Sequence, residues 1–147
     1  MPTIHTIGHT KKPLEAFIHL LQQANVDAVV DIRLRNTSQL AGFAKRDDLA
    51  FLLREGFQIG YEHRPELAPT PEILDAYRAS SDWAAYERSF LSLLTERRAE
   101  SFGRTLLAVW SRPCLLCSEA SPEHCHRRLV AEWWAERLPN VGIVHLR

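Results

Sequence analysis

The densest group of residues able to do chemistry lies between Cys114 and Arg127, in the run Cys-Leu-Leu-Cys-Ser-Glu-Ala-Ser-Pro-Glu-His-Cys-His-Arg. Ser121 and Pro122 are typical of a helix start, because a capping hydroxyl and a proline both suit that position. If Ser121 is the cap, Cys125 lies in the first turn of the helix, near the positive end of its dipole. That setting lowers a thiol pKa and also attracts an anion.

Three interpretations of this run compete. Zinc could be bound by Cys114, Cys117 and Cys125 with His124 or His126, because two residues separate the first pair of cysteines. However, Cys114 and Cys117 fall in a predicted strand, where residues three apart point to opposite faces. Alternatively, Cys117 or Cys125 is a redox-active or nucleophilic thiol. In the third interpretation the thiols are buried and inert, and the helix start holds an anion or only caps itself. We therefore expect no metal site, and the sequence names no cofactor.

A second feature is a basic loop, whose positive residues are Arg33, Arg35, Lys45 and Arg46 and which contains no acid. Guanidinium groups pair well with phosphate, and a hydroxyl such as that of Ser38 adds hydrogen bonds. The loop is therefore either a contact for an anion or nucleic acid, or a solvated segment whose charges do little. Asp31, just before the loop, is either a proton carrier or an internal partner of Arg33.

Short apolar runs alternate with helical patterns along the chain. Strands are predicted over residues 3–7, 28–33, 57–61, 114–117 and 141–146. Helices are predicted from Pro13, from Asp47 or Asp48 to Gly56, from Thr70, from Ser81 or Asp82, over 105–110 and from Ser121. This order predicts an α/β fold with right-handed crossovers, a mainly parallel sheet of about five strands and helices on both faces. We expect a single domain spanning residues 1–147.

Polar side chains follow the predicted strands, and ligands of parallel sheets bind outside the carboxyl ends of the strands. We therefore expect the site at that edge. The candidate proton carriers are His9, Asp31, Glu119 and His126, and the candidate thiols are Cys117 and Cys125. The candidate anion-binding residues are Gly8, Thr10, Arg33, Ser38 and Arg127.

Composition limits the class of protein. The chain has 147 residues, with 18 basic and 18 acidic side chains, 46% hydrophobic residues and three cysteines. The apolar content excludes a disordered chain, and the balanced charge argues against a polybasic nucleic-acid or membrane binder.

No run is long enough to span a bilayer, and no secretory signal is evident. Three cysteines cannot all pair, so we expect reduced thiols and a cytoplasmic location. A Walker loop, a dinucleotide fingerprint, a nucleophile elbow and a deaminase zinc motif are all missing.

Several segments together resemble one known family. They are Thr6-Ile7-Gly8-His9-Thr10, Val30-Asp31-Ile32-Arg33, Ser38, Phe43, Tyr61, Leu116-Cys117-Ser118-Glu119, Pro122, Cys125-His126-Arg127 and Val144-His145-Leu146. In these segments the chain resembles the bacterial and archaeal domain-of-unknown-function family four-eight-eight over almost its whole length. The run Cys-x-Glu through Pro-x-x-Cys-His-Arg is the most specific part, and Cys114 lies outside the pattern. The resemblance implies a single α/β domain and supplies no activity.

Our leading hypothesis is an enzyme that acts on an anionic substrate, a nucleotide or nucleic-acid phosphate, by hydrolysis or group transfer. A carboxylate and an imidazole close to guanidinium groups could combine general acid–base catalysis with stabilisation of charge in the transition state. One alternative is a non-catalytic module that binds nucleic acid or a nucleotide through the basic loop, with affinity that falls steeply with salt. The other is a redox or metal protein based on Cys117 and Cys125. We expect no membrane partner, and the sequence leaves the oligomeric state open.

Overall fold

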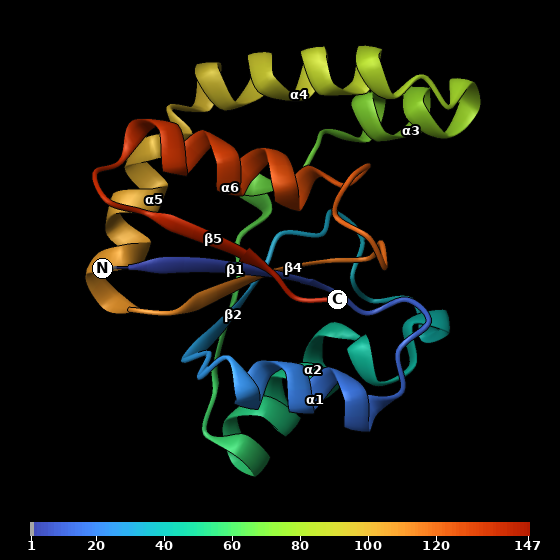
Figure 1. Cartoon of the computed structure of the whole chain (residues 1–147). Coiled ribbons are helices and arrows are strands. Elements are labelled where there is room, and N and C mark those ends of the chain that lie inside the picture. The colour runs from blue at the N-terminus through green and yellow to red at the C-terminus, as the bar shows by residue number, and fades with distance from the viewer. Residues whose placement is uncertain (1) are drawn as a thin grey trace.

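Five parallel strands form the centre of the protein in the computed structural model, which describes residues 2–147 (Figure 1). They are β1 (Thr3–Gly8), β2 (Ala28–Asp31), β3 (Gly60–His63), β4 (Pro113–Cys117) and β5 (Gly142–His145). Their order across the sheet is β3-β2-β4-β1-β5, and each neighbouring pair is parallel. The predicted α/β class and five-stranded parallel sheet are confirmed.

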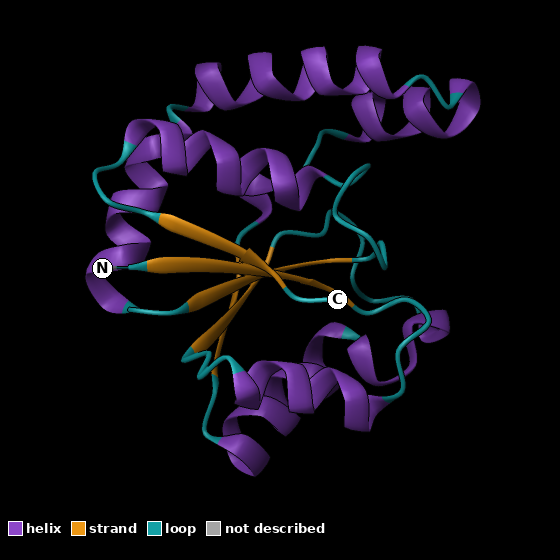
Figure 2. Ribbon diagram, viewed as in Figure 1, coloured by secondary structure: helices purple, strands orange, loops and turns teal. Residues whose placement is uncertain are grey.

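Helices cover both faces of this sheet, as predicted (Figure 2). The α-helices are α1 (Leu14–Gln23), α2 (Arg46–Phe51), α3 (Pro71–Ser80), α4 (Trp83–Arg97), α5 (Ala99–Val109) and α6 (His126–Arg137). Short 3-10 helices span Gln39–Ala44 and Pro65–Leu67, and a π-helical turn spans Leu52–Gly56. None of the helices in residues 2–147 has both the length and the apolar character required to cross a membrane.

The hydrophobic core has two layers, one on each face of the sheet. Helices α1 and α2 contribute Phe17 and Leu49 to the layer that also contains Cys114. Helices α4 and α6 contribute Phe90 and Trp134 to the other layer. Successive residues of β4 enter opposite layers because side chains alternate along a strand. Since β4 is covered on both faces, its fully buried run of apolar residues is explained.

The direction of the crossovers reverses between β1 and β4. The chain leaves β1 through α1 and crosses β4 to reach β2, whereas it leaves β4 through α6 and crosses β1 to reach β5. Figure 1 shows α1 and α6 on opposite faces of the sheet. The loops after β1 and β4 therefore diverge, and such a divergence creates a crevice at the carboxyl edge of a parallel sheet.

The five predicted strands and the helix starts at Pro13, Thr70 and Asp82 are confirmed, with shifted ends. The side chains of Thr70 and Asp82 cap α3 and α4, as expected for helix starts. The third strand begins at Gly60 and not at Phe57, because Gln58 has a φ of 54°, which is incompatible with extended backbone. Helix α5 already begins at Ala99, so the prediction of 105–110 found only its second half.

Besides that of α5, two helix starts were predicted wrongly. Helix α2 begins at Arg46 after Lys45, without a side-chain cap from Asp47 or Asp48. The last helix begins at His126, and Cys125 is its N-cap, with φ −140° and ψ 140°. Ser121 is therefore no cap, and Cys125 is not inside the first helical turn. Residues 118–124 instead form a loop that ends in a tight turn, where the Cys125 backbone N–H donates to the Pro122 carbonyl.

Candidate functional site

A pocket of about 140 Å³ opens at the carboxyl ends of β2 and β4, under helices α3 and α4. Three groups of residues line it. The charged group is Arg33, Arg35, Arg78 and Glu119, the aromatic group is Tyr77, Trp83, Tyr86 and His124, and the reactive group is Cys117, Cys125 and His126. Leu34, Pro69, Leu74 and Ser118 complete the lining. The pocket therefore combines basic groups, planar side chains and two thiols at the edge where the sequence predicts a site.

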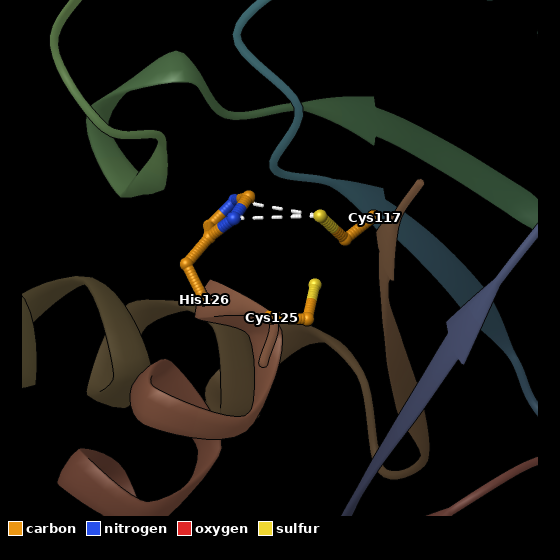
Figure 3. A group of neighbouring side chains, drawn as sticks. All are labelled: Cys117, Cys125 and His126. Carbon is orange, nitrogen blue, oxygen red and sulfur yellow. Dashed lines mark hydrogen bonds between the residues drawn. The ribbon is translucent and has the colours of Figure 1, made fainter. Parts of the chain in front are cut away.

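Cys117 and His126 form a hydrogen-bonded pair in this pocket (Figure 3). The Sγ atom of Cys117 lies 3.4 Å from Nδ1 of His126. Nε2 of His126 lies farther from that sulfur, at 3.9 Å, and is 2.7 Å from the backbone oxygen of Ile32. A carbonyl oxygen only accepts, so Nε2 carries a proton and Nδ1 of the neutral ring is the acceptor that faces the thiol. This geometry suits transfer of the thiol proton to His126.

The two sulfur atoms of the pocket have different protonation preferences. Burial by itself would raise the pKa of Cys117. Hydrogen bonds outweigh this effect and hold the pKa below its ordinary value; they come from the Cys125 thiol and from the backbone N–H groups of Ser118 and Glu119. The positive charge of Arg127 lowers the pKa of Cys117 further. Burial and the proximity of Cys117 raise the pKa of Cys125 well above its usual range. The expected lowering of the Cys125 pKa by a helix dipole is therefore wrong, and Cys117 is the more readily ionised thiol.

Cys117, Cys125 and His126 also form a compact set of possible soft-metal ligands. One sulfur or ring nitrogen from each residue lies within 4.8 Å of the other two. The four-ligand zinc site that includes Cys114 is wrong, because Cys114 is packed in the core layer on the opposite face of the sheet. Within residues 2–147 no further Cys, His, Asp or Glu joins the set. A closed structural zinc site requires four ligands, so the set does not form one.

Asp31 is a buried anchor and not a free proton carrier. Its Oδ1 accepts from the backbone N–H and Nε of Arg33, at 3.1 and 2.8 Å. Its Oδ2 accepts from Nη2 of Arg33 at 2.7 Å, from Nδ2 of Asn36 at 3.1 Å and from the hydroxyl of Tyr61 at 2.5 Å. Burial would raise the pKa of Asp31, but the hydrogen bonds and charge of Arg33 and the hydroxyl of Tyr61 lower it. The internal pairing of Asp31 with Arg33 considered from the sequence is thus observed, and the role of general acid or base is not supported.

The basic loop carries fewer free charges than its sequence suggests. Arg33 is paired with Asp31, Arg35 with Asp75 and Arg46 with Asp47. Within the loop only Lys45 has no ion pair in the described part of the chain. The side chain of Ser38 accepts a hydrogen bond from the backbone N–H of Leu40, so it caps the 3-10 helix and does not line the pocket. These contacts weaken the case for a nucleic-acid surface on this loop.

Arg127 is hydrogen-bonded to the backbone of the loop that follows β4. Its Nη1 donates to the backbone oxygen of Glu119 at 2.5 Å and its Nε to Oγ1 of Thr6 at 3.2 Å. The guanidinium is fully buried, and its Nη2 has no partner among residues 2–147. A Cβ atom on Gly8 would lie only 1.6 Å from the same Glu119 oxygen. Gly8 and Arg127 are therefore required by the path of the loop, and neither lines the pocket.

The remaining predicted residues divide between the pocket and its surroundings. Glu119 lines the pocket, and its side chain is exposed at the rim. His9 does not line the pocket; burial, and then the charge of Arg33, lower its pKa to about 4. Thr10 is exposed, and its backbone N–H donates to the Ser118 carbonyl at 3.1 Å. Of the predicted residues, Arg33, Cys117, Glu119, Cys125 and His126 meet in one pocket.

The aromatic wall of the pocket, formed by Tyr77, Trp83, Tyr86 and His124, was not predicted from the sequence. The rings of Trp83 and His124 stack with centroids 5.0 Å apart, and Trp83 also stacks on Tyr86 at 5.0 Å. Tyr77 packs edge-on against Trp83 at 5.7 Å. The available signal was the long connection between the third and fourth strands, which contains more helices than a single crossover requires.

One family profile, described as Domain of unknown function DUF488, matches residues 13–134. No curated protein and no solved structure matches the chain significantly. The matched segment includes β2, β3 and β4 and most of α6, so it contains every residue that lines the pocket. The match covers well over half of the chain and confirms the resemblance seen in the sequence. The protein therefore belongs to the family described as Domain of unknown function DUF488.

Proposed function

We propose that the protein is an enzyme that acts on an anionic phosphate ester, such as a nucleotide or nucleic-acid phosphate, with Cys117 as its nucleophile. The observation that carries this proposal is the Cys117–His126 pair, with Sγ 3.4 Å from Nδ1, in a pocket lined by arginines. A nucleophile beside a base that is itself oriented by a third group is the arrangement that covalent catalysis requires. The carbonyl of Ile32 is that third group.

The charges around the pocket suit an anionic substrate. Asp31 engages Nε and Nη2 of Arg33, which leaves Nη1 of that guanidinium for a ligand. Arg78 is exposed and forms no ion pair with any of the residues 2–147. Because Asp31 holds the Arg33 fork rigidly, Arg33 loses little side-chain entropy when it binds a phosphate. Arg33 and Arg78 are therefore the proposed phosphate ligands.

The reaction has two balanced steps. His126 Nδ1 first takes the thiol proton, and the Cys117 thiolate attacks phosphorus, so that an S–P bond forms and the ester O–P bond breaks. The leaving oxygen receives the proton from His126. Water then attacks phosphorus, the S–P bond breaks, inorganic phosphate leaves and the Cys117 thiolate is restored. His126 accepts one proton of that water and returns it to the Cys117 thiolate, which restores the starting thiol, so the net reaction is hydrolysis of the ester.

Phosphate release from p-nitrophenyl phosphate and from a set of nucleoside monophosphates tests the proposal. Cys117→Ser should abolish turnover, and His126→Gln should lower it by about 10²- to 10⁴-fold. Cys114→Ala is the matched control, because that thiol lies in the opposite core layer. The rate at which iodoacetamide alkylates Cys117 gives a second readout that needs no substrate. The proposal fails if Cys117→Ser leaves turnover unchanged, or if Cys117 is alkylated no faster than Cys114.

A further inference from the structure

Cys125 is a second thiol in the pocket that the proposed hydrolysis does not use. Its side chain is 2% exposed, and its sulfur lies within 4.8 Å of the Cys117 sulfur. Figure 3 shows the Cys125 sulfur pointing into the space that Cys117 and His126 share. The third cysteine, Cys114, packs in the opposite core layer. Among residues 2–147, the second thiol near Cys117 is therefore that of Cys125.

The surroundings of the two sulfurs separate their roles. Cys117 has the lower pKa and the hydrogen bond to His126, so it is the thiol that ionises first. Cys125 stays protonated and donates to Cys117. Two neighbouring thiols with opposite protonation preferences are the pattern of a reactive and a resolving cysteine.

We propose that Cys117 and Cys125 are a redox modification site, in which peroxide oxidises Cys117 and Cys125 resolves it as a disulfide. The inference rests on the reactive Cys117 of the proposed function and adds the regulation of that site. A disulfide has an S–S length of about 2.05 Å. The sulfur atoms of Cys117 and Cys125 already lie within 4.8 Å of each other, so they need to move only a short distance to form the bond. While the disulfide exists, the nucleophile is blocked, and a dithiol restores it.

The chemistry requires hydrogen peroxide as the oxidant. His126 takes the proton of the Cys117 thiol, and the thiolate attacks one peroxide oxygen. An S–O bond forms, the O–O bond breaks, and the released hydroxide takes the proton from His126 and becomes water. Cys125 then gives its proton to Nδ1 of His126 and attacks the sulfur of the Cys117 sulfenic acid. The S–S bond forms as the S–O bond breaks, and the leaving hydroxide takes the proton from His126 and becomes a second water. Two thiols are oxidised and one peroxide is reduced.

Hydrogen peroxide added to the purified full-length chain tests this proposal, with intact mass and peptide mapping under non-reducing conditions as readouts. The wild-type protein and Cys114→Ala should each lose the mass of two hydrogen atoms, and dithiothreitol should reverse the loss. Cys125→Ser should instead gain oxygen on Cys117 and proceed to irreversible sulfinic acid. Cys117→Ser should form no disulfide.

The wild-type protein alone decides the outcome, so the test does not depend on the folding of a variant. Oxygen adducts on Cys117 without a Cys117–Cys125 linkage would overturn the redox proposal. One tightly bound zinc per chain that protects both thiols from iodoacetamide would also overturn the redox proposal, because Cys117 and Cys125 would then be metal ligands. Rapid alkylation and phosphate release by Cys117 without a disulfide would reject only the redox pair. Slow alkylation of Cys117 would reject the proposed nucleophile.

Discussion

Arg127 donates a hydrogen bond of 2.5 Å to the backbone oxygen of Glu119, at the point where that oxygen passes over Gly8. The contact connects the first turn of α6 to the loop that follows Cys117. The same loop provides the backbone N–H groups of Ser118 and Glu119 that stabilise the Cys117 thiolate. The buried Arg127 side chain therefore helps to position the backbone N–H groups that surround the Cys117 sulfur.

Gly8→Ala tests whether the loop needs this close passage. The added Cβ would lie 1.6 Å from the Glu119 oxygen and 2.6 Å from the Glu119 carbonyl carbon, which are backbone atoms that cannot rotate away. We expect a loss of about 1–3 kcal/mol in the free energy of unfolding, as for other overpacked sites, and slower alkylation of Cys117. Urea unfolding and iodoacetamide kinetics measure the two effects. Gly56→Ala is the control, because its nearest neighbour would be a flexible leucine side chain at 3.6 Å.

Arg127→Met tests the electrostatic part of the same contact. Loss of the guanidinium removes a positive charge that lowers the pKa of Cys117, and it frees the Glu119 carbonyl. The pKa of Cys117 should rise, and each unit of rise should slow alkylation below that pKa by about tenfold. Arg104→Met is the matched control, because Arg104 is exposed on α5 and does not line the pocket. Equal alkylation rates for Arg127→Met and the wild-type protein would show that Arg127 has only a packing role.

The features predicted correctly from the sequence depend on short-range patterns. Alternating apolar runs and helical stripes are local, so the sheet, its helices and the caps at Thr70 and Asp82 could be inferred. Because parallel strands end at one edge, the meeting of Arg33 with Cys117 was also predictable.

The features that were missed depend on contacts between distant residues. Arg35 pairs with Asp75, which lies 40 positions later, so a loop that is basic in sequence is largely neutralised in space. The start of α6 at His126 reflects the path of the preceding loop over Gly8, which no local capping signal contains. The aromatic wall likewise depends on how α3 and α4 pack against the sheet edge.

Asp31→Asn should destabilise the protein strongly. The substitution leaves the buried guanidinium of Arg33 without a counter-charge, and breaking a buried pair in this way costs about 3–5 kcal/mol. Asp75→Asn breaks the exposed pair with Arg35 and should cost only about 0–1 kcal/mol. Urea unfolding at neutral pH compares the two. A similar small loss in both variants would show that the Asp31 network contributes no more than a surface pair.

His9 should make the stability of the protein depend on pH in a defined window. Burial and the charge of Arg33 lower its pKa to about 4, whereas an unfolded histidine has a pKa of about 6.5. Between these two values the unfolded chain binds a proton that the folded protein does not, so stability falls as the pH drops from about 6.5 towards 4. His9→Gln should reduce this slope in urea unfolding experiments. His19→Gln, at an exposed position on α1, is the control and should keep the wild-type slope. An NMR titration with a His9 midpoint near that of an unfolded histidine would contradict the prediction, because the imidazole could not then be buried beside the charge of Arg33.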